Sequence, residues 1–94
     1  MVTPISTALL AERTKRGWNQ RRAAQFLGTS QPQYQKWESG ENEPGGHYYP
    51  AIFTFLGLDE YEAAVLVLRD RLARQNVPLD AARDWRAHLA QGSE

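Results

Sequence analysis

Apolar residues recur at helical spacing along the chain, and glycine, proline or polar residues interrupt them at short intervals. In the first such segment, residues 4–16, Ile5 and Leu9 share one helix face, and Gly17 follows as at many helix C-termini. No stretch alternates apolar and polar residues between hairpin turn signals, so strands are not expected. The pattern predicts an all-α chain.

Two shorter helices are predicted next, each from its own capping signals. Asn19 is a favourable N-cap for a helix over 20–27. Ser30 is a favourable N-cap for a third helix, which ends at Gly40. Pro32 falls within the first turn of that helix, where its missing N–H costs little.

The second half of the chain predicts three more helices after a loop at 41–47. They are expected over about 50–57, 59–75 and 79–91. In the helix over 59–75, one face carries Leu58, Tyr61, Ala64 or Val65, Leu68 and Leu72. Because Leu66 and Val67 also need cover, this helix is expected to be apolar on more than one side.

Length and charge limit the function classes. Ninety-four residues, 41% of them apolar, are enough for one small domain. The 11 basic and 11 acidic residues balance, so attraction of the whole molecule to a polyanion is not expected. Residues 1–50, however, carry six Lys or Arg against four Glu, and five of the six lie close together: Arg13, Lys15, Arg16, Arg21 and Arg22.

Several kinds of site are not expected. The chain has no Cys, and His47 and His88 lie far apart in the sequence, so neither a disulfide nor a metal site is predicted. No nucleophile–base pair, acidic dyad or phosphate-binding loop is present, so an enzyme is not expected. The sequence also lacks a signal peptide and an apolar run long enough to span a membrane.

The third helix separates its side chains into two faces of different chemistry. Tyr34 and Trp37 point one way and are expected to anchor the helix in the core. The opposite face carries amide and ammonium groups and no carboxylate, which suits a DNA major groove, where Gln pairs with adenine and Lys reaches guanine. The residues on this face are Gln31, Pro32, Gln35 and Lys36.

The start of the second helix carries the groups that grip a phosphate. Free backbone N–H groups and the positive end of the helix dipole favour an anion there. Side-chain donors follow in sequence: Asn19, Gln20, Arg21 and Arg22.

Several motifs, in order and with matching gaps, resemble the Cro/C1-type (Xre-like) helix-turn-helix regulators. The resemblance covers roughly residues 5–58. It includes the opening of the second helix, the turn after it, the recognition helix with its "WExG" ending, and the close of the fourth helix. These are Gly17-Trp18-Asn19-Gln20, then Ala24, Leu27 and Gly28, then Ser30-Gln31 and Trp37-Glu38-Ser39-Gly40, then Leu56-Gly57.

This resemblance implies a five-helix, lambda-repressor-like DNA-binding domain with a C-terminal helical extension and no cofactor. It implies that the base contacts are Gln31, Pro32, Lys36 and Gln35, and that Gln20 grips a phosphate or reaches a base edge. It also implies that Gln33 and Ser39 lie at the phosphate backbone or nearby, and that Arg13 pairs with Glu38. The sequence departs from the family at Pro32, which lacks a side-chain donor, and at Trp18, Phe26 and the acidic residues Glu41 and Glu43 of the loop.

The expected organisation is a DNA-binding domain at 1–58 and a helical extension at 59–94 for dimerisation or partner binding. The favoured function is a dimeric, sequence-specific repressor of double-stranded DNA, cytoplasmic and prokaryotic or phage-borne. The alternative is a protein-interaction module on the same fold, such as an antitoxin or a structural adaptor, because the chain is neutral and the loop is acidic.

Overall fold

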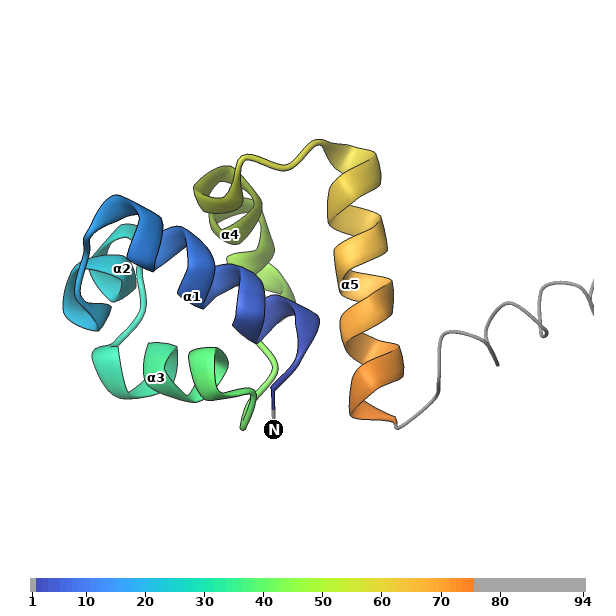
Figure 1. Cartoon of the computed structure of the whole chain (residues 1–94), viewed down its shortest axis with the longest axis horizontal. Helices are drawn as coiled ribbons and strands as arrows, with labels where there is room; N and C mark the ends of the chain where they lie inside the picture. The colour runs from blue at the N-terminus through green and yellow to red at the C-terminus, as the bar shows by residue number, and fades with distance from the viewer. Residues whose placement is uncertain (1, 76–94) are drawn as a thin grey trace, which may run out of the picture.

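The computed structural model describes residues 2–75, which form five α-helices and one short 3₁₀ turn (Figure 1). These described residues contain no strand, and the predicted all-α class is confirmed. The helix predicted over 79–91, with its Trp85 and Leu89, lies outside the described residues. The elements are α1 (Pro4–Arg16), α2 (Gln20–Leu27), α3 (Gln31–Ser39), η1 (Gly46–Tyr48), α4 (Tyr49–Leu56) and α5 (Glu60–Arg74).

The first three helices begin and end where their capping signals predict. Asn19 Oδ1 accepts the Arg22 N–H at 2.8 Å, and the Ser30 hydroxyl accepts the Gln33 N–H at 3.3 Å. Gly28 ends α2 with φ of 73°, a left-handed conformation that costs a glycine little. These caps are local, which explains why the sequence places the helix ends accurately.

The core lies where α1, α2, α3 and α4 meet, while α2 and α5 lie at opposite sides of the view in Figure 1. The two predicted anchors of α3, Tyr34 and Trp37, are both 0% exposed. The remaining members of the core are Ile5, Leu9, Ala23, Ala24, Leu27, Ile52 and Phe55.

The loop between α3 and α4 is more ordered than the sequence predicts. It contains the η1 turn, and α4 begins at Tyr49, one residue before the expected Pro50. The Tyr48 ring packs edge-on against Trp37 with centroids 4.8 Å apart, and Tyr49 stacks on Phe53 at 5.4 Å. Both tyrosines therefore cap the core.

The predicted apolar face of α5 is only partly covered, since Leu58, Val65 and Leu72 are half-buried. Tyr61 is 78% exposed and Leu68 is 56% exposed, whereas Ala63 and Asp70 are buried. Leu66 packs against the core. Apolar residues occur on more of the α5 circumference than α1 can cover, so some of them stay exposed. The buried carboxylate of Asp70 determines which side of α5 faces inward.

Within residues 2–75, no helix combines the length and the apolar character needed to cross a lipid bilayer.

Candidate nucleic-acid interface

The outer face of α3 presents the four side chains that the sequence assigns to base contact. Gln31, Pro32, Gln35 and Lys36 are all exposed. The buried rings of Tyr34 and Trp37 fix the rotation of the helix about its axis. The polar face of α3 is therefore held outward by the core.

A shallow depression of about 320 Å³ lies between the end of α3 and the loop that follows it. Pro32, Gln35, Lys36, Ser39 and Glu41 line it. The carboxylate of Glu41 is thus the negatively charged group at the edge of an otherwise neutral and basic surface. It would oppose a nearby phosphate.

The N-terminus of α2 forms a second polar depression, of about 300 Å³, beside the turn at Gly17. Asn19 already uses its side-chain oxygen as the cap, so its amide nitrogen is the group left to donate. The Arg22 guanidinium lies 4.7 Å above the Trp18 ring, and Arg21 is exposed. Two cations therefore flank the free N–H groups of this helix end.

Arg13 and Glu38 form a bidentate ion pair that joins α1 to α3. Arg13 Nε donates to Glu38 Oε2 at 2.8 Å, and Arg13 Nη2 donates to Oε1 at 2.7 Å. Arg13 Nη1 also donates to the Trp18 carbonyl at 3.0 Å, and Gln20 Nε2 donates to Glu38 Oε1 at 3.2 Å. This network holds the start of α2 and the end of α3 in one arrangement. The Gln20 amide has a second N–H that this network does not use.

The network perturbs the titration of its members. Burial alone would raise the pKa of Glu38, but the hydrogen bonds from Arg13 and Gln20 lower it below the ordinary glutamate value. The hydrogen bond to Glu38 raises the pKa of Arg13. Burial, followed by the adjacent Glu38 carboxylate, raises the pKa of the Tyr34 hydroxyl. Glu38 therefore stays ionised and Tyr34 stays protonated over the physiological range.

The basic cluster at residues 13–22 is divided in the structure. Arg13 is engaged by Glu38, and Arg16 donates to Glu12 at 2.8 Å and to the Phe55 carbonyl at 2.9 Å. Arg21 and Arg22 flank the α2 N-terminus, while Lys15 lines a groove between α1 and α5. The cluster is therefore not one continuous surface for a polyanion.

Arg16 also explains two departures from the family pattern. Its guanidinium lies 4.9 Å from the Trp18 ring and 5.6 Å from the Phe26 ring. The Trp18 and Phe26 rings are 5.7 Å apart, and both contact Phe55. A cation above aromatic faces is attracted by their quadrupoles. The two large residues thus form a small structural cluster with Arg16.

Gln33 and Ser39, the remaining predicted phosphate contacts, make local hydrogen bonds. Gln33 Oε1 accepts the Thr29 hydroxyl at 2.9 Å, which leaves its amide N–H groups as donors. Ser39 Oγ donates to the Lys36 carbonyl at 3.0 Å and accepts the Glu41 N–H at 3.3 Å.

Sequence reasoning missed Asp70 and Arg74, which connect α5 to the end of α3. Their spacing of four residues on one helix is typical of an exposed ion pair, and it is the one signal that could have suggested an interaction.

The described part of the chain holds no group of three or more His, Cys, Asp or Glu placed to bind a metal ion.

A model of the helix-turn-helix family matches residues 9–62, which include α2, α3 and the turn between them. The chain belongs to the Cro/C1-type helix-turn-helix family. This is a family of DNA-binding regulatory domains, and the chain is a DNA-binding helix-turn-helix regulator. Curated proteins and solved structures yielded no significant match.

Proposed function

We propose that this helix-turn-helix protein reads double-stranded DNA in a sequence-specific manner, with residues 31–38 in the major groove, and that it acts as a repressor. The observation that carries the proposal is the outward polar face of α3, held by two fully buried aromatic anchors. Nine helical residues span about 14 Å, roughly the rise of four base pairs.

The exposed side chains of α3 match the donor and acceptor pattern of base edges. The amides of Gln31 and Gln35 can pair with adenine, and the Lys36 ammonium can reach O6 and N7 of guanine. The Pro32 ring offers apolar contact to a thymine methyl group. These four residues are the proposed base contacts.

Contacts to phosphates would fix the orientation of α3 on the duplex. The N-terminus of α2 supplies backbone N–H groups with the side chains of Asn19, Gln20, Arg21 and Arg22 around them. Gln33 and Ser39 flank α3 and are proposed to reach the adjacent backbone.

Two copies are proposed to bind together. Proteins of this kind place recognition helices in half-sites about 34 Å apart. The exposed apolar side of α5, with Leu68 and Tyr61, is the proposed surface for the second copy, within the functional extension at 59–94. Bound in this way, the protein would block polymerase without catalysing a reaction. It would act in the cytoplasm of a prokaryote and be encoded by the prokaryote or by a phage.

Selection of bound duplexes from a random library, followed by a salt titration, tests this function. Binding should weaken with a log–log slope near −0.9 for each phosphate neutralised. A selected duplex that showed no salt-sensitive binding near neutral pH would remove the proposal.

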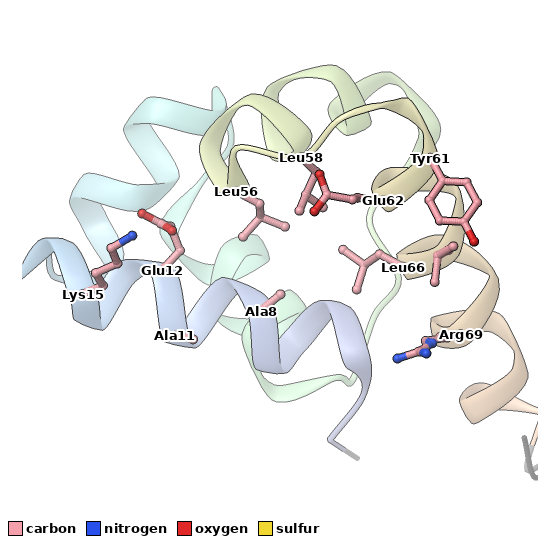
Figure 2. Close-up of a pocket in the computed structure, with 11 residues that line it drawn as sticks. Ala8, Ala11, Glu12, Lys15, Leu56, Leu58, Tyr61, Glu62, Leu66 and Arg69 are labelled. Atoms are coloured by element: carbon pink, nitrogen blue, oxygen red, sulfur yellow. The ribbon is translucent and has the colours of Figure 1, made fainter.

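A protein-interaction module is the second candidate, and the grooves beside α5 favour it. One groove of about 490 Å³ lies between α1 and α5, and apolar side chains such as Leu56, Leu58 and Leu66 line much of it (Figure 2). A second groove of about 530 Å³ lies on the other side of α5. An antitoxin or adaptor would use such grooves for a partner helix. It would bind that partner with little dependence on DNA.

A further inference from the structure

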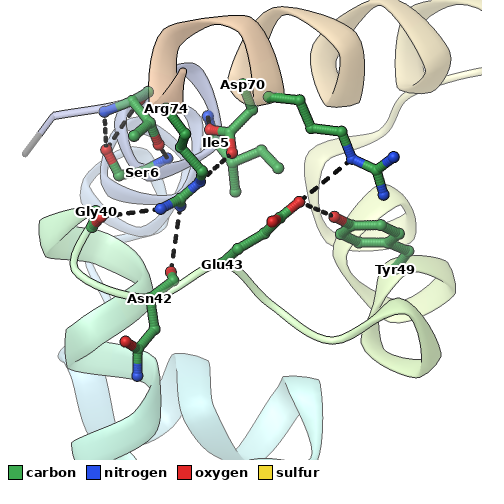
Figure 3. Close-up of polar contacts among 10 residues, drawn as sticks. Ile5, Ser6, Gly40, Asn42, Glu43, Tyr49, Asp70 and Arg74 are labelled. Atoms are coloured by element: carbon green, nitrogen blue, oxygen red, sulfur yellow. Dashed lines mark hydrogen bonds and ion pairs between the residues drawn. The ribbon is translucent and has the colours of Figure 1, made fainter. Parts of the chain in front are cut away.

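Two side chains at the end of α5 contact segments that are distant in the sequence. Asp70 is 0% exposed, and its Oδ1 accepts the backbone N–H of Ile5 at 2.9 Å. Its other oxygen, Oδ2, accepts Arg74 Nε at 2.8 Å (Figure 3). The buried carboxylate therefore joins α5 to the start of α1 and orients Arg74.

The remaining nitrogens of Arg74 reach the segment that follows α3. Nη1 donates to the Gly40 carbonyl at 3.1 Å, and Nη2 donates to the Asn42 carbonyl at 3.2 Å (Figure 3). Each of the three guanidinium nitrogens thus has a separate oxygen acceptor. The planar fork of an arginine can satisfy this arrangement, whereas the single ammonium of a lysine cannot.

The two charges also complement the two helix ends that they contact. Ile5 is in the first turn of α1, which has no acidic residue of its own, so Asp70 supplies the negative charge there. Gly40 is the C-cap of α3, where the helix dipole is negative, and Arg74 supplies a cation. The pair stabilises both ends at once.

Asp70 and Arg74, here called the clamp, are also connected to the backbone of a proposed base contact. The Asn42 N–H donates to the Lys36 carbonyl at 3.2 Å, and the Asn42 carbonyl accepts Arg74. Asn42 is therefore held from both sides, by the recognition helix and by α5. Any shift of Arg74 would reach the last turn of α3 through Gly40 and through Asn42.

We propose that Asp70 and Arg74 are positioning residues for DNA recognition, which set the placement of the last turn of α3 and of Lys36 without touching DNA. This inference rests on the proposed function. Base readout depends on hydrogen bonds with narrow distance limits, so a small displacement of Lys36 weakens the preferred site selectively. Phosphate contacts made elsewhere would be left unchanged.

The test compares Arg74→Lys and Arg74→Gln with the unaltered chain on the selected duplex and on a duplex of scrambled sequence. Both variants are expected to lose on the order of tenfold in affinity for the selected duplex. They should keep the salt slope and nearly all of the affinity for the scrambled duplex, because the charged phosphate contacts lie on α2 and are not removed. The base preference at the position read by Lys36 should relax in both.

Arg71→Lys and Arg71→Gln are the matched controls on the same helix. Arg71 is exposed and pairs with Glu43 at 3.5 Å, outside the clamp, so these variants should bind both duplexes normally. Circular dichroism at the assay temperature establishes that each variant is folded. Asp70→Asn is a second variant that tests the same inference. It keeps an oxygen for the Ile5 N–H and removes the charge that orients Arg74, so it should also lower the preference for the selected duplex over the scrambled one.

Three results would overturn the inference. A folded Arg74→Gln protein with unchanged affinity and base preference would show that the clamp does not position α3. Full binding by Arg74→Lys, with loss in Arg74→Gln, would show a direct phosphate contact. If the unaltered chain bound no DNA, the proposed function would fall, and this inference with it. That result is distinct from the other two, which require binding by the unaltered chain.

Discussion

Lys36 is an exposed residue whose position on the outer side of α3 is set by its buried neighbour. Its side chain is exposed, while its neighbour Trp37 is fully buried and holds the helix turn in place. The lysine side chain therefore leaves the outer side of the helix without the backbone having to reorganise. This pre-organisation is what base readout requires.

Replacing Lys36 by Ala should cost about 1–3 kcal/mol on the selected duplex and relax discrimination at one base pair. Competition binding against single-base variants of the duplex measures both effects. Lys15→Ala is the matched control, because it removes the same side chain from the groove beside α5. Unchanged affinity and base preference in Lys36→Ala would mean that another face of the protein docks.

Glu41 should weaken binding, because its carboxylate lies at the edge of the α3 surface. Glu41→Gln removes that charge and is expected to raise affinity for every duplex by a few-fold at low salt, with a smaller gain at high salt. Fluorescence anisotropy at two salt concentrations measures the change. The control is Glu60→Gln on α5, which should have no effect; an equal gain in both variants would indicate net charge alone.

The ionisation of Glu38 makes the free energy of unfolding of the domain depend on pH in the acid range. Its pKa is lower in the folded chain than the value of about 4.3 expected when unfolded. The ion pair therefore stabilises the fold fully above that unfolded value. The stabilisation is lost as pH falls through the folded pKa.

In Glu38→Gln, this dependence should disappear. The variant should be less stable near neutral pH, by up to about 3–5 kcal/mol, because Arg13 loses its charged partner and keeps only neutral acceptors such as the Trp18 carbonyl. The difference from the unaltered chain should shrink as the pH falls below about 4. Urea unfolding at several pH values measures it, and a constant difference over that range would contradict the assignment.

At the scale of the elements, α2 and α3 are both too short to be stable alone in water. Their relative position depends on the Arg13–Glu38–Gln20 network and on the shared core. The two helices therefore act as one unit, in which α2 is proposed to grip the backbone while α3 reads bases.

Removing a cation from the α2 N-terminus should affect all sequences alike. Arg21→Ala is expected to weaken selected and scrambled duplexes by the same factor and to reduce the salt slope by about 0.9. Arg16→Ala provides the contrast: it should lower the melting temperature, since Arg16 packs on three rings, and leave the slope unchanged. A sequence-dependent loss in Arg21→Ala would contradict phosphate contact.

At the scale of the whole molecule, α5 has two roles in these proposals. Its inner side holds α1 and the end of α3 through Asp70 and Arg74, while its outer side leaves Leu68 and Tyr61 exposed. The grooves beside it offer apolar surface that a second copy could cover.

A charge at the centre of that outer side should prevent association. Leu68→Glu is expected to yield monomers by sedimentation velocity and to weaken binding to a two-half-site operator much more than to a single half-site. Thr54→Glu, at another exposed position, is the control. An unchanged association state in Leu68→Glu would exclude this surface.

The sequence by itself determined the ends of the first three helices and the outward polar face of α3. Caps such as Asn19 and Ser30, and the spacing of Tyr34 and Trp37, act over a few residues, so they can be recognised without tertiary structure. The family motifs lie in the same local segments.

Only the tertiary structure decided the inward side of α5 and the division of the basic cluster. Asp70 is buried because it accepts the N–H of Ile5, 65 residues away. Arg16, although exposed, is bonded to the protein itself because it donates to the Phe55 carbonyl and to Glu12. Helical periodicity ranks positions by hydrophobicity, and it cannot anticipate a polar group whose partners come from distant segments.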